Sequence, residues 1–186
     1  MDIELDAVGR AQAFRAARLL AGLSPSVIVS SDLMRARDTA QMLADVTDLP
    51  VRADKRLREI DVGSWQGLRF DEVLEKYPVE AEQWRDGGEG RRGGGETLVE
   101  VGERATAAVG EALGSVGAGE TLVVVTHGAA GRALVASMIA LPTTSWRALG
   151  SLANCCWSVL GETDGGWRLH EHNAGTLPEP VVGDDR

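Results

Sequence analysis

Apolar and polar residues alternate with two different periods along this chain, and these periods predict helices and strands in turn. Within residues 8–22 apolar side chains recur every three or four positions, which is typical of a helix with one buried face, and Gly22 is placed to end it. The apolar run at 27–31 predicts a buried strand, and a second amphipathic pattern predicts a helix over 33–46. The positions expected to face the core are Ala13, Phe14, Ala17, Leu20 and Ala21 in the first helix and Ala36, Thr39, Ala40 and Leu43 in the second.

The middle of the chain carries the signals of an excursion from the core at about residues 68–96. Two short helical patterns fill residues 70–86 and are divided by Pro78, which cannot continue a helix. The glycine-rich residues 87–95 predict a flexible connection. Before this excursion, residues 51–57 predict a second and more polar strand.

A strong helix start and a strongly apolar strand follow the excursion. Thr97 and Glu100 form the pattern of a capping box, which opens a helix expected to run to about Leu113. Residues 121–127 (TLVVVTH) show no polar alternation, which is typical of a central strand covered on both faces. The expected buried face of the helix consists of Leu98, Val101, Ala105, Ala108 and Ala112.

The last elements complete an alternating order of strands and helices. A helix is predicted over about 130–139, and two strands are predicted near 154–160 and 167–173. Such alternation favours a mostly parallel sheet with helices on both faces. A length of 186 residues suits one well-packed domain. We therefore predict an α/β chain with three α/β/α layers and a single domain over residues 1–186.

Composition and charge limit the classes of partner that this protein is expected to bind. The chain is 44% hydrophobic and 25% charged, as globular proteins are, and its net charge of −9 opposes approach to nucleic acid or an anionic membrane. It shows no targeting pattern and no run of about 18 apolar residues, so we expect a cytoplasmic protein that does not engage a membrane. Cys155 and Cys156 are adjacent in an apolar run and are expected to fill the core. We predict no metal and no other cofactor.

Arg35 is the first candidate for a functional residue. It lies in the first turn of the second predicted helix, where the helix dipole and unpaired N–H groups disfavour a cation unless an anion is close. Its side chain could simply extend into solvent. Alternatively, Arg35 clamps a bound anion. The local pattern leaves both interpretations open.

Further candidates lie beyond the carboxyl ends of predicted strands, where ligands gather in open α/β sheets. His127 ends one strand and Gly128 follows it, so an imidazole can donate hydrogen bonds to phosphoryl oxygens while the backbone approaches a ligand closely. Glu59 is predicted to end the other strand and could donate a proton to a leaving group. Alternatively, Glu59 pairs with Arg56 or Arg58.

Other polar residues carry weaker signals. His170 and His172 alternate along the last predicted strand without a recognisable set of metal ligands around them. Arg91 and Arg92 lie in the glycine-rich connection and could reach an anionic substrate, but a solvated loop is the favoured interpretation.

The resemblance to a known family rests on four ordered segments: SSDLMRARDTA, RLREIDVGSWQG, GGGET and VVVTHG. They resemble the histidine phosphatase superfamily, which has the phosphoglycerate mutase-like fold. The resemblance implies a nucleophilic histidine, arginines and a second histidine that bind phosphoryl oxygens, and a glutamate that acts as acid and then base. It makes Arg35 the clamp, Glu59 the proton donor and His127, with Gly128 beside it, the second phosphate-binding histidine. LPTTSWRALGSLANCCWSVL and GGWRLHEHN are similar to one branch, the actinobacterial glucosyl-3-phosphoglycerate phosphatases.

The chain departs from this family at the residue that carries the reaction. The family opens with a strand that ends in Arg-His-Gly and supplies the nucleophile, and this triplet does not occur in the sequence, whose histidines are His127, His170 and His172. We therefore expect the sheet to lack the family's first strand, beside residues 121–127. A start placed too far downstream, or an upstream segment outside this sequence, is favoured over genuine loss.

The sequence thus predicts a metal-independent phosphomonoester hydrolase that acts through a phosphohistidine on a small phosphorylated metabolite. One alternative is an inactive phosphate-binding or interaction protein. Another is a phosphoglycerate mutase, which the absence of long insertions disfavours. A small phosphorylated substrate is the expected partner, nucleic acid and membrane are not, and the oligomeric state stays open with a homodimer among the alternatives.

Overall fold

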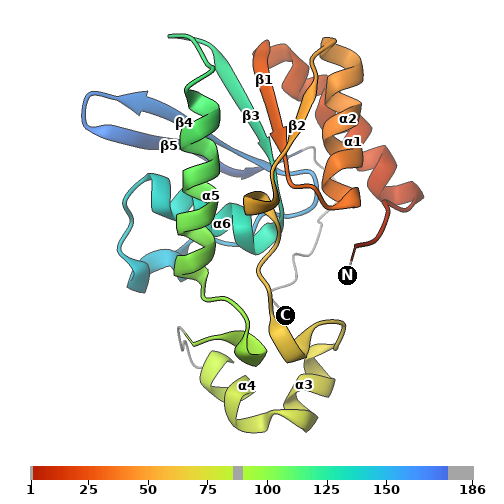
Figure 1. Ribbon diagram of the computed structural model, residues 1–186, viewed down its shortest axis with the longest axis vertical. Coiled ribbons are helices and arrows are strands. Elements are labelled where there is room, and N and C mark those ends of the chain that lie inside the picture. The colour runs from red at the N-terminus through yellow and green to blue at the C-terminus, as the bar shows by residue number, and fades with distance from the viewer. Residues whose placement is uncertain (1, 86–89, 176–186) are drawn as a thin grey trace.

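Helices and strands alternate along the chain largely in the predicted order (Figure 1). The computed structural model describes residues 2–85 and 90–175. The α-helices are α1 (Ala7–Leu20), α2 (Met34–Thr47), α3 (Phe70–Lys76), α4 (Pro78–Arg85), α5 (Leu98–Leu113) and α6 (Gly128–Met138). The strands are β1 (Pro25–Ser30), β2 (Val51–Ala53), β3 (Thr121–Val125), β4 (Trp157–Thr163) and β5 (Gly166–Ala174). Short 3₁₀ helices are η1 (Ala21–Leu23), η2 (Lys55–Leu57), η3 (Gly63–Trp65), η4 (Arg92–Gly94) and η5 (Thr143–Ala148).

A parallel sheet in the order β2-β1-β3 forms the centre of the structure. Within it Ile28 of β1 lies in register with Val51 of β2 and with Val123 of β3. Strands β4 and β5 form a separate antiparallel pair. The mostly parallel sheet is therefore confirmed for the first three strands, and the last two strands form a hairpin beside them.

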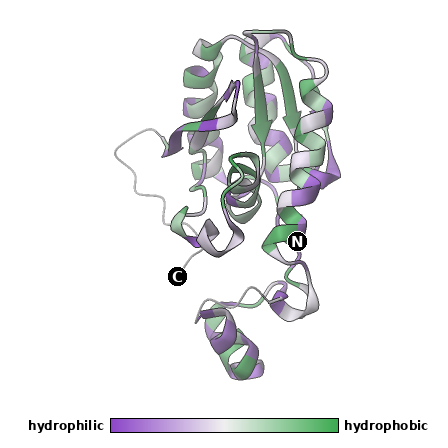
Figure 2. Ribbon diagram, turned by 90° about the vertical axis from the view of Figure 1, so that its left-hand side faces the viewer, coloured by the Kyte–Doolittle hydropathy of each residue, from purple (hydrophilic) through white to green (hydrophobic). Residues whose placement is uncertain are grey.

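Helices cover both faces of the parallel sheet, which confirms the three-layer prediction. Successive side chains of β1 point to opposite faces. Val27 and Val29 pack in one apolar cluster with Ala105 of α5, whereas Ile28 packs in another with Leu43 of α2. In Figure 2 the strands of the parallel sheet are mostly hydrophobic, whereas the helices beside them carry both hydrophobic and hydrophilic residues. Because burial of apolar area drives folding, these two clusters fix the arrangement of the layers.

Two local predictions are confirmed at the level of individual contacts. The capping box is formed: the Glu100 N–H donates to Thr97 Oγ1 at 3.2 Å, and the Thr97 N–H donates to Glu100 Oε2 at 2.9 Å. Pro78 separates α3 from α4 as expected. These helices pack on η3 through a small apolar cluster and lie beyond one end of the sheet (Figure 1).

Other local predictions are wrong, and tertiary contacts explain why. Phe14 is 53% exposed, because α1 turns its alanines rather than this ring toward the sheet. The second strand ends at Ala53, because the Asp54 side chain accepts the Arg56 N–H at 2.8 Å and starts η2. Cys155 has a φ of 54° before β4 begins, so the two partly buried cysteines do not alternate on a strand.

Strand β3 lies at an edge of the parallel sheet, as expected for a sheet that lacks the family's first strand beside it. Among the described residues it pairs with β1 alone. Its side chains are half-buried apart from Val123, which is 9% exposed. A continuous apolar run is unusual at a sheet edge, where charged or polar side chains normally discourage further pairing.

The glycine-rich connection is only partly described. Residues 87–89 of it lie outside the described part of the chain. The remainder is not a purely solvated loop, because Arg92–Gly94 form η4 and Arg91 pairs with Glu100. Across residues 2–85 and 90–175, no helix combines the length and apolarity needed to cross a membrane.

Candidate functional site

The carboxyl ends of β1 and β3 bring Ser31 and His127 together. Because the strands are parallel neighbours, with Ser30 in register with Val125, the residues that follow them emerge side by side. The Ser31 N–H donates to the Val125 carbonyl at 2.8 Å, and His127 Nε2 lies 2.9 Å from Ser31 Oγ. Ser31 is fully buried, so this contact fixes the imidazole at the rim of the sheet.

Arg35 contributes positive charge to the same place. It lies in the first turn of α2, directly after β1, and its side chain is half-buried. Burial, and then the charge of Arg35, lower the pKa of His127 from its ordinary 6.5 to about 4. His127 is therefore a neutral imidazole at neutral pH beside a cationic guanidinium. An anion bound beside the imidazole would raise this pKa again, because it favours the cationic form of histidine.

Glu59 occupies the start of α6, next to His127. Its Oε2 accepts the Ala129 N–H at 3.1 Å, and its Oε1 accepts the N–H groups of Ala130 and Ile60 at 2.9 Å each. These backbone donors include N–H groups that the first turn of a helix leaves unpaired. The Glu59 carboxylate is therefore held at the N-terminus of α6, directly after His127.

The alternative pairing of Glu59 with a neighbouring arginine is wrong. Arg56 binds Asp54 at 2.6 Å, and Arg58 binds Asp32 at 2.7 Å. Glu59 also follows η2 in an irregular segment and does not end a strand.

Arg104 of α5 positions the segment that carries Glu59. Its guanidinium donates to the carbonyls of Arg56, Arg58 and Glu59 at 2.6, 2.8 and 3.2 Å. It also makes a bidentate pair with Glu96, with N···O distances of 2.7 and 2.8 Å. Sequence reasoning missed this residue, because its partners are backbone carbonyls more than forty positions away and leave no local pattern. Ser31 was likewise missed, although it lies within the SSDLMRARDTA segment.

Gly128 is needed for close packing at the start of α6. A Cβ at this position would lie 3.1 Å from the Leu152 carbonyl oxygen and 3.9 Å from Glu59 Oε2. The Leu152 N–H donates to the Gly128 carbonyl at 3.3 Å. Glycine therefore lets the chain around Leu152 pass close to the candidate site.

The remaining histidines lie on β5. His172 Nδ1 is 2.9 Å from Ser158 Oγ on the paired strand, and its Nε2 is 2.9 Å from the Gly150 carbonyl. His170 lies two residues earlier on β5. In the described part of the chain, no three His, Cys, Asp or Glu side chains gather as a metal site would require.

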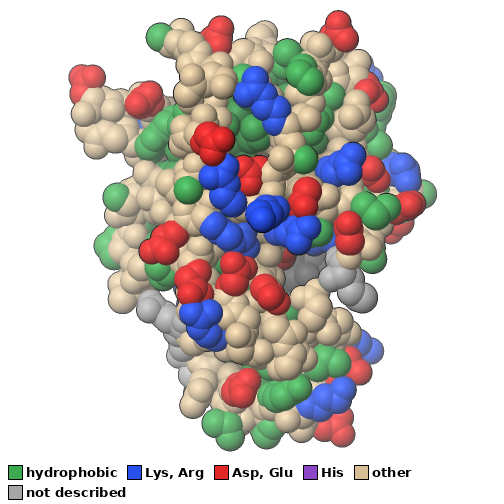
Figure 3. All heavy atoms as spheres, viewed as in Figure 1, with side chains coloured by type: hydrophobic (Ala, Val, Ile, Leu, Met, Phe, Trp, Pro, Cys, Tyr) green, Lys and Arg blue, Asp and Glu red, His purple; other side chains and the backbone are tan. Residues whose placement is uncertain are grey.

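Charge on the face drawn in Figure 3 is locally mixed. Basic side chains gather across its middle, and acidic side chains lie close to them. Arg56 pairs with Glu111, and Arg58 pairs with Asp32. Because the net charge is −9 and these arginines are paired, positive potential is confined to small regions, such as the one around Arg35.

A cationic side chain, a half-buried imidazole and a carboxylate thus gather at strand and helix ends on an α/β scaffold. The family model of the histidine phosphatase superfamily (branch 1) matches residues 1–175. The chain therefore belongs to the histidine phosphatase superfamily.

Individual relatives agree with this assignment. A glucosyl-3-phosphoglycerate phosphatase of Mycolicibacterium vanbaalenii is 39% identical over 191 positions, which cover 94% of this chain and 85% of the relative. A mycobacterial glucosyl-3-phosphoglycerate phosphatase solved with inorganic phosphate is 38% identical, with a TM-score of 0.87 over 94% of this chain and 89% of that one. A probable phosphoglycerate mutase of Yersinia enterocolitica is 35% identical, over 89% of this chain and 77% of the relative. These likenesses support a hydrolase and make the mutase alternative weaker.

Proposed function

We propose that this protein is a phosphomonoester hydrolase of the histidine phosphatase type, and that glucosyl-3-phosphoglycerate is its substrate. The observation that carries the proposal is the contact between Ser31 and His127 at the carboxyl ends of neighbouring strands, where the charge of Arg35 acts on the same imidazole. The named activity of its relatives supports the choice of substrate. A glucosylated phosphoglycerate is a small anion, which suits a local positive site on an acidic chain.

Each residue of the site takes a role that follows from its chemistry. The Arg35 guanidinium binds phosphoryl oxygens and stabilises the charge that develops on them during transfer. His127 precedes α6 and Gly128 begins it, so the imidazole and the backbone beside it contact the same phosphoryl group. Glu59 lies against the start of that helix and donates a proton to the leaving oxygen.

The nucleophilic histidine is the part of the mechanism that this sequence does not supply. His127 is already assigned to the phosphate, and both ring nitrogens of His172 have close polar neighbours. We place the nucleophile on an additional strand alongside β3, whose apolar side chains suit the interior of a sheet. That strand would end in Arg-His-Gly beside His127.

The binding half of the proposal is tested on the chain as it stands. Calorimetry with inorganic phosphate should detect binding, and Arg35→Ala should weaken it at least tenfold, because a charge-assisted contact to the anion is lost. Arg37→Ala is the matched control, since Arg37 is an exposed arginine on the same helix. Equal phosphate affinity in parent and Arg35→Ala would remove Arg35 from the site.

The catalytic half is tested by phosphate release from glucosyl-3-phosphoglycerate. We expect turnover from a longer version that adds an apolar strand ending in Arg-His-Gly, and none from the chain alone. Turnover by the chain alone would show that the nucleophile is misassigned. Phosphate binding without turnover in both versions would favour the second candidate function, a non-catalytic phosphate-binding protein, which the histidine content of this sequence supports.

A further inference from the structure

The hydroxyl group of Ser31 lies in the short segment that joins β1 to α2. Ser31 is fully buried, and its N–H donates to the Val125 carbonyl at 2.8 Å, so its position relative to β3 is fixed. Within the described residues, two groups lie at hydrogen-bonding distance from Ser31 Oγ. The Leu33 N–H donates to it at 3.3 Å, and His127 Nε2 lies 2.9 Å away. These two neighbours decide where the hydroxyl hydrogen points.

The hydroxyl hydrogen of Ser31 has one acceptor, which is His127 Nε2. The Leu33 N–H is a donor, so it occupies a lone pair of Oγ and cannot accept the hydrogen. A buried hydroxyl hydrogen without an acceptor costs free energy, so the hydrogen is directed at Nε2. Nε2 accepts only while it carries no proton, and in the neutral imidazole the proton then lies on Nδ1. The contacts of Ser31 therefore indicate the Nδ1–H tautomer of His127.

This tautomer decides what His127 offers to a ligand. Nε2 is occupied by Ser31, and in the part of the chain that the structure describes no group forms a hydrogen bond with Nδ1. A protonated Nδ1 is a donor, which suits a phosphoryl oxygen. In the opposite tautomer Nδ1 would present a lone pair, which repels an anion. The tautomer thus determines whether the imidazole attracts or opposes an anion.

We propose that Ser31 is a positioning residue, whose hydroxyl holds His127 in the Nδ1–H tautomer so that the imidazole presents an N–H donor to an oxyanion. Ser31 acts through His127 and stays buried itself. The tautomer follows from the hydrogen bonds of the folded chain alone. Its use in binding phosphate rests on the proposed function, so the two parts are tested by separate measurements.

The tautomer is measured by NMR of isotope-labelled histidine ring nitrogens in the full chain near neutral pH, where protonated and unprotonated nitrogens resonate far apart. His127→Gln identifies the His127 signals by their loss. The parent should show a protonated Nδ1 and an unprotonated Nε2 for this residue. His172 is an internal reference of the opposite kind, because its Nε2 must be protonated to donate to the Gly150 carbonyl at 2.9 Å.

Substitution of Ser31 should change the His127 signals and leave those of His172 unchanged. Ser31→Ala removes the hydroxyl, so the population should shift toward the Nε2–H tautomer that free histidine favours. Ser31→Thr keeps a hydroxyl on the same carbon and should retain the parent tautomer. Thermal melting of each variant shows whether the fold is kept.

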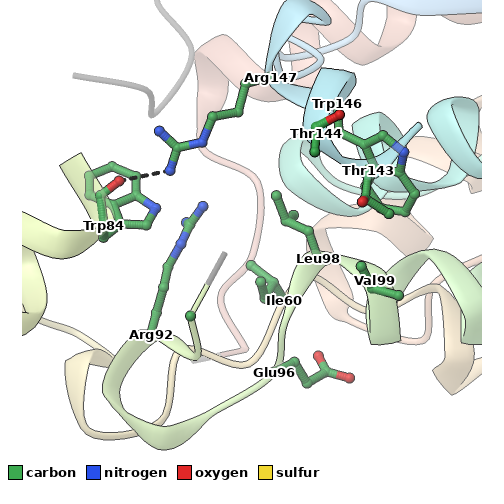
Figure 4. A pocket seen from close by; sticks show the side chains of 11 residues that line it. Ile60, Trp84, Arg92, Glu96, Leu98, Val99, Thr143, Thr144, Trp146 and Arg147 are labelled. Carbon is green, nitrogen blue, oxygen red and sulfur yellow. Dashed lines mark hydrogen bonds between the residues drawn. The ribbon is translucent and has the colours of Figure 1, made fainter. Parts of the chain in front are cut away.

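Two control variants remove hydroxyl groups that do not contact the imidazole. Ser30→Ala removes a buried hydroxyl that donates to the Ser31 carbonyl at 2.9 Å. Thr144→Ala removes an exposed hydroxyl from the lining of the cavity in Figure 4, which is bounded by α4, η4, the start of α5 and η5. Both variants should keep the Nδ1–H tautomer of His127.

Calorimetry with inorganic phosphate then tests what the tautomer does. Ser31→Ala should weaken phosphate binding about three- to tenfold, because one neutral hydrogen bond to the anion is lost, whereas Ser31→Thr and both controls should bind like the parent. An Nε2–H tautomer in the parent, or an Nδ1–H tautomer that survives in Ser31→Ala, would overturn the role of Ser31. A changed tautomer with unchanged phosphate affinity would overturn its link to binding. A parent that binds no phosphate would contradict the proposed function, and the parent spectrum would still decide the tautomer.

Discussion

Acidification should destabilise the folded chain through His127. Burial, and then the charge of Arg35, lower the pKa of this residue from 6.5 to about 4. Between those two values the unfolded chain binds a proton that the folded chain does not, so the free energy of unfolding falls as the pH falls. Each pH unit in this window changes it by about 1.4 kcal/mol, which amounts to about 3 kcal/mol for His127. The stabilisation is fully present above the unfolded pKa and is lost once the pH is below the folded one.

The measurement is urea unfolding of the parent chain and of His127→Gln across this pH window. Carboxylates also titrate there, so the quantity that matters is the difference between the two chains. The parent should lose about 3 kcal/mol more than the variant, because glutamine takes up no proton. An NMR titration of the His127 imidazole should have its midpoint near 4. Parallel stability curves, or an NMR midpoint at or above 6.5, would refute the burial of a neutral imidazole.

Three further substitutions test the contacts that hold the site. Thr97→Ala removes the side-chain cap of α5 and should lower the free energy of unfolding by about 1 kcal/mol in urea. Arg104→Met leaves three carbonyls and Glu96 without their donor and should lower it by at least about 2 kcal/mol. Asp2→Asn removes a carboxylate that accepts the first N–H of α2 at 2.7 Å, so calorimetry should show phosphate binding about two- to fivefold tighter.

Matched variants show whether these effects have the stated causes. Thr97→Ser keeps the capping oxygen and should retain most of the stability that Thr97→Ala loses. Thr106→Val removes a buried hydroxyl that has no hydrogen-bond partner among the described residues, so it should cost nothing or stabilise the chain. An Arg104→Met chain as stable as the parent would contradict the stabilising role of the Arg104 hydrogen bonds. Unchanged or weaker phosphate binding in Asp2→Asn would show that Asp2 does not compete with the anion.

Features that depend on neighbouring residues were correctly predicted from the sequence. The box formed by Thr97 and Glu100 and the break at Pro78 involve atoms within a few positions of one another. The helix over 33–46 and the strand over 27–31 follow from side-chain periodicity, which depends only on backbone geometry. The family resemblance also rested on short segments, and the match over residues 1–175 confirmed it.

Features that depend on which distant segments pack against a helix or strand could not be predicted from local sequence patterns. Phe14 fits the periodicity of α1, but the docking of the helix decided which part of its circumference faces the core. The apolar run at β3 is typical of a central strand, and only the missing Arg-His-Gly segment of the family pointed to the edge position that the structure shows. Periodicity reports that a residue can be buried, whereas only the neighbouring elements decide whether it is.

The sequence by itself determined most of the elements, their order, the family and the residue types of the candidate site. The tertiary structure decided that Glu59 binds the start of α6 rather than an arginine, and that Arg104 holds the segment behind it. It also decided that Ser31 contacts His127. The physical reason is range: capping, turns and periodicity act over a few residues, whereas hydrogen bonds and charges between distant segments form only after hydrophobic packing has brought those segments together.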